Sequence, residues 1–174
     1  MFRVYMGVLS LVTCVLWTNP EAAAAQFISV PAVVFVTTHM NVTRTVNGQS
    51  IECNDSFAGD SREARFMLYP EIGATTEYNR RFFCGDVAID YYQYMTTAEL
   101  DSAHNQAHPS RFTFGSTITV TYDRGAGTSV TVWSSEGTFP LIENGNIPLT
   151  GVTNTPGVVF HHVSDDIQSW LDFG

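Results

Sequence analysis

The histidines are the first residues of this chain that could do chemistry. His104 and His108 are four residues apart, and on a helix this spacing would place two imidazoles on one face, as a zinc site requires. However, Asn105 stands where a zinc protease motif has glutamate, and a proline follows His108 directly. A third ligand would have to come from His161 or His162. We therefore expect no metal site, and we place His104 and His108 at the exposed end of a helix.

Aromatic side chains are the second such group. Tyr91, Tyr92 and Tyr94 lie close together, and Trp133 follows alternating valine and threonine residues. Such rings can stack on sugar rings, although large aromatic side chains more often fill a core. Because Trp133 falls among the outward threonines of its expected strand, we expect it to be more exposed than Val132. No Gly-x-Ser-x-Gly motif is present, so the pattern marks no nucleophile.

The elements that would position these residues are mostly strands. Between residues 114 and 135, apolar and threonine side chains alternate on both sides of a glycine-rich turn at 125–127. This period of two predicts an antiparallel hairpin that buries one face. Further strands are expected at 27–38, 42–46 and 66–69, the second followed by an Asn-Gly turn.

Two short helices are also expected. Thr97 can cap a helix over 97–106, in which acidic residues favour the first turns. Ser164 can cap a second helix, with Ile167, Trp170 and Leu171 on one face. His161 and His162 directly precede it in a strand, where their side chains would point to opposite faces.

Residues 1–25 have the pattern of a signal peptide. Arg3 precedes an apolar run that is too short to span a bilayer of about 30 Å, and four alanines before Gln26 suit a signal peptidase. An uncleaved anchor or a lipoprotein signal is the alternative, but the residues around Cys14 do not fit one. We expect a secreted, extracellular, monomeric protein of one domain that has no membrane attachment after cleavage.

Charge narrows the class of partner. The chain has 17 acidic and 8 basic residues and a formal net charge of −9. Such a surface repels phosphate backbones and anionic lipid, so nucleic acid and membranes are not expected partners. We expect a polysaccharide or an extracellular protein as partner, and no cofactor.

Two cysteines, Cys53 and Cys84, remain after signal cleavage. An even pair in an exported protein is usually bonded, so we predict a disulfide between them. Free thiols or a metal site are the alternative, and the spacing lacks the further ligands that zinc requires. Asn41 and Asn54 lie in Asn-x-Ser/Thr sequences and are candidate glycosylation sites in a eukaryotic host.

The order of several short motifs resembles a known family. GATTEYN at 73–79, FCGD ending at Asp86, TTAELDSAHN at 96–105 and a final HVSDDIQSWL are similar to segments of the rare lipoprotein A-like double-psi β-barrel family, to which expansins are related. The resemblance implies a mainly β fold, a six-stranded double-psi β-barrel over 73–174 with one or two short helices. Residues 26–72 would supply strands and the disulfide loop that lead into it.

The resemblance also implies a groove that binds or cleaves cell-wall polysaccharide. Where active relatives carry two aspartates, this chain has Ser134-Ser135-Glu136 and His162. Cleavage of a glycoside needs a proton donor, so a barrel without these acids should bind sugar without cutting it. Glu136 is the one candidate catalytic residue. The resemblance implies a groove lined by His104, Trp133, Ser135, Glu136 and His162.

Three hypotheses follow for the function. The first is a secreted, non-catalytic protein that binds an extracellular ligand, most simply a cell-wall polysaccharide. The second is a weak lytic or wall-loosening enzyme with Glu136 as general acid and His162 or His104 as helper. The third is a protease inhibitor or effector that uses residues 139–157, rich in Asn, Gly and Pro, as a recognition loop.

Overall fold

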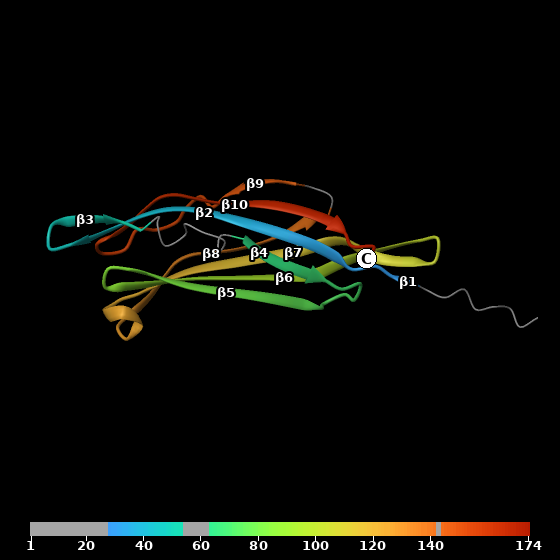
Figure 1. The fold of residues 1–174 in the computed structure, drawn as a ribbon, viewed down its shortest axis with the longest axis horizontal. Helices are drawn as coiled ribbons and strands as arrows, with labels where there is room; N and C mark the ends of the chain where they lie inside the picture. The colour runs from blue at the N-terminus through green and yellow to red at the C-terminus, as the bar shows by residue number, and fades with distance from the viewer. Residues whose placement is uncertain (1–27, 54–62, 142–143) are drawn as a thin grey trace, which may run out of the picture.

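The computed structural model describes residues 28–53, 63–141 and 144–174, and these residues form two β-sheets. The molecule is elongated along its strands, and the two sheets lie one over the other (Figure 1). The predicted signal peptide and Asn54 lie outside the described residues. No helix within the described ranges is long and apolar enough to cross a membrane.

The first sheet is an antiparallel meander. Its strands are β5 (Thr75–Cys84), β6 (Val87–Ala103), β7 (Gln106–Thr121) and β8 (Ser129–Pro140), in that order across the sheet, with the short β1 (Ile28–Ser29) parallel to the start of β7. The 3₁₀ turn η3 (Asp123–Gly125) joins β7 to β8. The hairpin that the sequence predicted around this turn is confirmed.

The second sheet combines segments from both ends of the chain. The long strand β2 (Ala32–Val46) pairs with β10 (Val158–Leu171) along nearly its whole length. The other edge of β2 pairs with β4 (Glu63–Leu68) at one end and β3 (Gln49–Glu52) at the other, and β9 (Gly145–Pro148) pairs with β10. Asn47 and Gly48 form the predicted turn between β2 and β3, both with positive φ.

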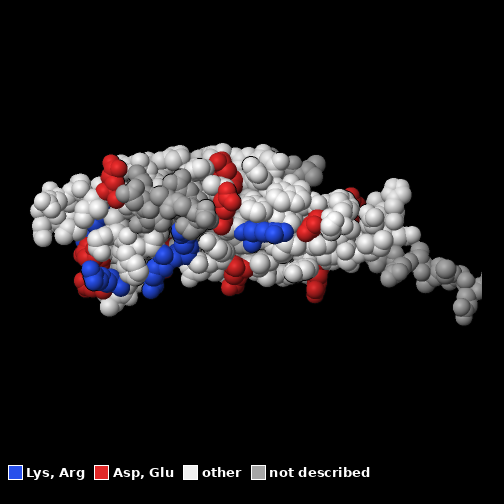
Figure 2. Space-filling view, viewed as in Figure 1, with Lys and Arg blue, Asp and Glu red and all other residues white. Residues whose placement is uncertain are grey.

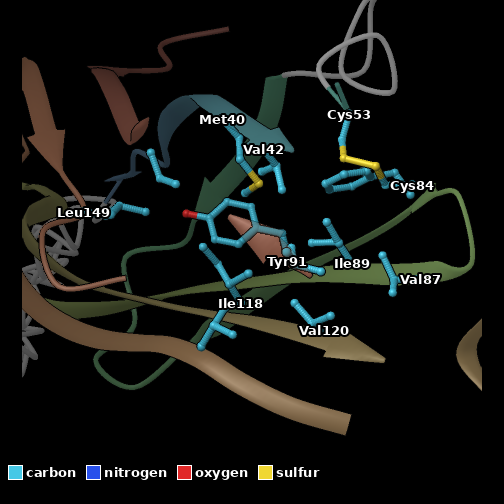
Figure 3. Close-up of a cluster of buried hydrophobic side chains, with 14 residues drawn as sticks. Met40, Val42, Cys53, Cys84, Val87, Ile89, Tyr91, Ile118, Val120 and Leu149 are labelled. Atoms are coloured by element: carbon cyan, nitrogen blue, oxygen red, sulfur yellow. A yellow bond between two sulfur atoms is a disulfide. The ribbon is translucent and has the colours of Figure 1, made fainter. Parts of the chain in front are cut away.

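The two sheets face each other and enclose the core. Alternate residues of the long strands point inward, and they form two hydrophobic clusters. Tyr91 of β6 is 2% exposed and lies at the centre of one cluster, among side chains from both sheets (Figure 3). Its hydroxyl points away from the disulfide (Figure 3).

The predicted disulfide is confirmed. Cys53, just after β3, is bonded to Cys84 at the end of β5, and the Cα atoms are 5.3 Å apart. Because β3 and β5 belong to different sheets, the bond ties the two sheets together at one end of the molecule (Figure 3).

The two long sides of the molecule differ. On one side β4 lies close to β5, where the Thr76 hydroxyl donates a hydrogen bond of 2.8 Å to the Met67 carbonyl. On the other side the edge strands are β8 and β9. The sandwich is joined on the β4–β5 side, and its open side lies between β8 and β9, which do not pair with each other. Beyond β9, the Thr153 amide donates a hydrogen bond of 2.9 Å to the Val132 carbonyl of β8.

Both predicted helices are wrong, since the described residues contain strands at these places. Residues 97–106 form the hairpin between β6 and β7, and its turn residues His104 and Asn105 have φ of 53° and 62°. The C-terminal segment is strand β10, in which Val163 and Ile167 point into the core. A spacing of four fits one face of a helix and one face of a strand equally well, which explains the second error.

The closed, six-stranded double-psi barrel that the family resemblance implies is not shown. The described residues form two sheets with separate strand orders.

Candidate functional site

A hollow of about 270 Å³ lies on the open side of the sandwich. One wall is formed by β8 and β7, and the other by the end of β9 and the residues that follow it. The residues that line it are Phe114, Ser116, Trp133, Ser134, Ser135, Glu136, Gly137, Phe139, Ile147, Pro148, Leu149 and Thr150. Three of the five expected groove residues, Trp133, Ser135 and Glu136, are therefore brought together.

The register of β8 directs two of these side chains inward. Trp133 pairs with Ile118 and Ser135 pairs with Ser116, and both partners are buried on the inner face of the sheet. Directly opposed residues share a face. A register shift leaves Val132 as an extra residue, so the alternation that placed Trp133 outward is interrupted. Trp133 is more exposed than Val132, which is 4% exposed, but the register turns its ring inward rather than outward, partly buried against the core.

Glu136 occupies the rim of the hollow. It pairs with Gly115, and its carboxylate accepts a hydrogen bond from the Tyr94 hydroxyl, which reaches it across β7. This bond is the main cause of a raised pKa of Tyr94. Glu136 is thus held by a phenol on the outer face of the sheet, while its strand neighbour Ser135 points inward.

Two further hollows adjoin the central one. One, of about 210 Å³, shares Phe139 and Ile147 with it. The other, of about 320 Å³, shares residues 148–150 with it. We call these three neighbouring hollows the edge groove.

His162 lies in the third hollow, which the expected groove residues Trp133, Ser135 and Glu136 do not line. His161 lines the same hollow. A register shift in β10 makes His161 an extra residue, so that both imidazoles lie on the outer face: the Nε2 of His161 is 2.9 Å from the Thr43 hydroxyl and that of His162 is 3.2 Å from the Ser164 hydroxyl. The prediction that the two histidines point to opposite faces is wrong for this reason.

The same outer face carries a second polar cluster that the sequence did not indicate. The Nε2 of His39 is 2.8 Å from an Asp166 oxygen, and the Asn146 amide donates a 2.7 Å hydrogen bond to the other oxygen. The bonds from Asn146 and His39 lower the pKa of Asp166. The cluster fixes β9 to β10 and so supports one wall of the edge groove.

His104 is not part of the groove. It is exposed at the tip of the β6–β7 hairpin, and it lines none of the three hollows. Within the described ranges, no three His, Cys, Asp or Glu side chains are grouped so that they could hold a metal ion. Asn41 is exposed on the outer face of β2, where a glycan could be attached.

A buried carboxyl group is the most unusual polar feature of the core. Asp165 of β10 is completely buried and accepts hydrogen bonds from the Tyr91 hydroxyl (2.6 Å) and the Thr38 hydroxyl (2.7 Å). Burial raises the pKa of Asp165 from 3.8 to about 6, although both hydrogen bonds oppose this shift. The sequence does not indicate that Asp165 is buried, because the predicted C-terminal helix would place Asp165 in its first turn.

Ser116 links this buried group to the edge groove. Its side chain is 2% exposed, lines the central hollow, and lies close enough to Tyr91 to affect its pKa. Its Oγ makes no well-directed hydrogen bond to a described residue. A buried hydroxyl without a partner is costly, and a ligand or a water molecule at the groove would offset that cost.

The groove carries little charge. Glu136 is the one charged residue among the described residues that line the three hollows. Arginines are engaged elsewhere: Arg44 with Asp86 and Arg81 with Asp90, at 2.8 and 2.7 Å. On the face shown in Figure 2, acidic and basic side chains are interspersed, and no broad patch of one sign is seen.

Comparisons of the chain with protein-family models, with curated proteins and with solved structures find no match. The class of the protein is thus defined by its own structure: a two-sheet β-sandwich with an edge groove.

Proposed function

We propose that this protein is secreted and that it binds an extended polysaccharide chain in the edge groove without cleaving it. The single observation that carries the proposal is the grouping of Trp133, Ser135 and Glu136 in one hollow, beside two further hollows that share some of its lining residues. An indole ring with hydroxyl groups beside it suits the apolar face and the hydroxyls of a sugar ring.

The lining of the groove supports binding without turnover. Hydrolysis of a glycoside ordinarily uses two carboxyl groups on either side of the bond. Among the described residues that line the three hollows, Glu136 alone carries a carboxylate, and Tyr94 holds it at the rim. The buried Asp165 has no exposed surface.

Secretion is supported by two features of different kinds. The first 25 residues have the pattern of a signal peptide. The Cys53–Cys84 disulfide is a bond that persists mainly in oxidising compartments. Kinship with the rare lipoprotein A-like family stays a prediction, because only the short motifs support it.

Sedimentation with insoluble cellulose, chitin and peptidoglycan tests the proposal. We expect the protein to sediment with at least one of them, and Trp133→Ala to remove most of that binding. Trp170→Ala is the matched control, since Trp170 is 44% exposed and stacks on Phe35 outside the groove. Because Trp133 also contacts the core, Ser135→Arg provides a second groove variant at an exposed position.

Two results would overturn the proposal. One is an absence of binding to every polysaccharide tested. The other is release of soluble fragments that Glu136→Gln abolishes, which would establish the lytic alternative. The inhibitor alternative has less support, because residues 139–157 contain β9, and Leu149 within them is buried.

A further inference from the structure

The chain that follows β9 crosses the open side of the sandwich beside the central hollow. We call residues 152–157 the strap. The Thr153 amide of the strap donates a hydrogen bond of 2.9 Å to the Val132 carbonyl, on the edge of β8 that pairs with no described strand. Val132 directly precedes Trp133, which lines the central hollow. The strap therefore meets β8 at one end of this hollow.

Hydrogen bonds to both sheets hold the strap in place. The Tyr122 hydroxyl, just after β7, donates a bond of 3.0 Å to the Pro156 carbonyl. From β2 of the other sheet, the Thr45 amide donates a 2.8 Å bond to the Gly157 carbonyl, and Arg44 Nη1 donates to the same oxygen at 3.0 Å. The strap is thus a fixed wall that joins the two sheets at this end.

The floor and the second wall of the central hollow are also closed. The buried side chains of Phe114 and Ser116 line it from the inner face of β7. Opposite β8, the wall contains Leu149, which is buried and whose amide donates a 3.0 Å hydrogen bond to the Val163 carbonyl of β10. A ligand in this hollow can therefore extend outward or along the groove past Phe139, but not past the strap.

Hydroxyl groups gather inside this closed end. Ser116 is 2% exposed, and its hydroxyl makes no well-directed hydrogen bond to a described residue. Ser135 lies directly opposite on β8 and shares the same face of the sheet. A buried hydroxyl without a partner gains from a ligand that supplies a hydroxyl of its own. A sugar ring at this point would pair with Ser116 while its apolar face lies against Trp133.

Cellulose, chitin and the glycan strands of peptidoglycan are all β-1,4-linked, so an interior sugar continues into the chain from two opposite ends of its ring. A ring held between Trp133 and Ser116 has the strap at one end and the core beneath it, so the chain can continue in one direction alone. We propose that the central hollow binds the terminal sugar of a β-1,4-linked chain, which then leaves over Phe139 and Ile147 toward the second hollow. This inference rests on the proposed function and names the part of the polysaccharide that is bound.

The number of chain ends tests the proposal. Three soluble probes are used: mixed-linkage β-glucan, glycol chitin, and peptidoglycan glycan strands freed of their peptides. Each is titrated by calorimetry, both whole and after partial acid hydrolysis to shorter chains. For at least one probe, cutting the chains to about a tenth of their length should lower the half-saturating mass concentration about tenfold, because equal mass then supplies more ends.

The outcomes separate this proposal from the function on which it rests. A half-saturating mass concentration that cutting leaves unchanged would overturn the chain-end proposal, since binding to the interior depends on the mass of chain present. Sedimentation with a solid polysaccharide, combined with no binding of any cut chain, would overturn it as well. Both results would leave polysaccharide binding established. If neither the solids nor the soluble probes bind, the proposed function itself is overturned.

Ser116→Ala tests the polar contact with the terminal sugar. The change removes a buried hydroxyl that has no well-directed partner, so it should not lower the free energy of unfolding. It should weaken the binding of cut chains about fivefold, the effect of one hydrogen bond. Thr119→Ala is the matched control, because Thr119 is on the outer face of the same strand and lines none of the three hollows. Equal binding by the two variants would overturn the placement of the terminal sugar at Ser116.

Discussion

Tyr94 and Glu136 meet across a strand that separates them, because the residue between them is Gly115. Tyr94 is on β6 and Glu136 is on β8, and both pair with Gly115 of β7. A Cβ at Gly115 would overlap the Tyr94 ring. The absence of a side chain at this position therefore lets a phenol lie flat over the sheet and hold the groove carboxylate.

Gly115→Ala should displace Tyr94 and break its hydrogen bond with Glu136. We expect a loss of about 1 to 3 kcal/mol in the free energy of unfolding, as for overpacking elsewhere, measured by chemical denaturation. Gly145→Ala is the control, because a Cβ there meets no atom within 4 Å. Equal stability of the two variants would contradict the role assigned to Gly115.

The pH dependence of stability should show the buried Asp165. Its pKa is raised in the folded protein from 3.8 to about 6, so the folded state binds the proton more tightly than the unfolded state. The stabilisation is complete below about pH 4 and is lost as the pH rises through about 6, a change of about 3 kcal/mol. Urea denaturation between pH 4 and 8 measures this slope.

Two variants test which residue causes this pH dependence of the free energy of unfolding. Asp165→Asn should remove the pH dependence. Asp166→Asn should not, because the pKa of Asp166 is lowered and its contribution is lost as the pH falls. A slope that survives Asp165→Asn would show that another group is responsible.

Reduction of the disulfide should loosen one end of the sandwich. The bond closes a segment of 31 residues and joins the two sheets. The double variant Cys53→Ser/Cys84→Ser should lower the free energy of unfolding by about 3 to 4 kcal/mol on the chain-entropy model. Thermal unfolding with and without reductant measures the effect in the natural sequence, and the double variant should not respond to reductant.

The β6–β7 turn offers a direct test of hairpin against helix. Asn105 has a φ of 62°, which glycine adopts without strain. Asn105→Gly should be tolerated in a hairpin turn, where glycine is favoured at positive φ, whereas in the interior of a helix glycine is unfavourable. A lower melting temperature for Asn105→Gly would contradict the observed turn.

Strand signals in the sequence were reliable where the alternation was long. The hairpin at 114–135 and the Asn47-Gly48 turn were predicted because β-branched residues alternate and the turn residues tolerate positive φ. The two helix predictions failed because capping residues and a spacing of four occur in strands as well. His104-Asn105 could have been recognised as a two-residue turn, since asparagine is favoured there.

The site was predicted only in part. Ser135 and Glu136 line the central hollow, but the directions of Trp133 and His161 depend on two register shifts that no local pattern reveals. Asp165 was missed because its burial depends on the pairing of β10 with β2, which are more than 100 residues apart in the chain.

The open side of the sandwich also bears on whether copies of this protein stick together. Exposed strand edges invite pairing with a neighbouring molecule, and proline, which has no backbone N–H to offer, discourages it. Pro140 ends β8 and Pro148 ends β9. Each strand bordering the groove thus ends in a residue that cannot donate a backbone hydrogen bond, which discourages another molecule from extending the sheet at that end.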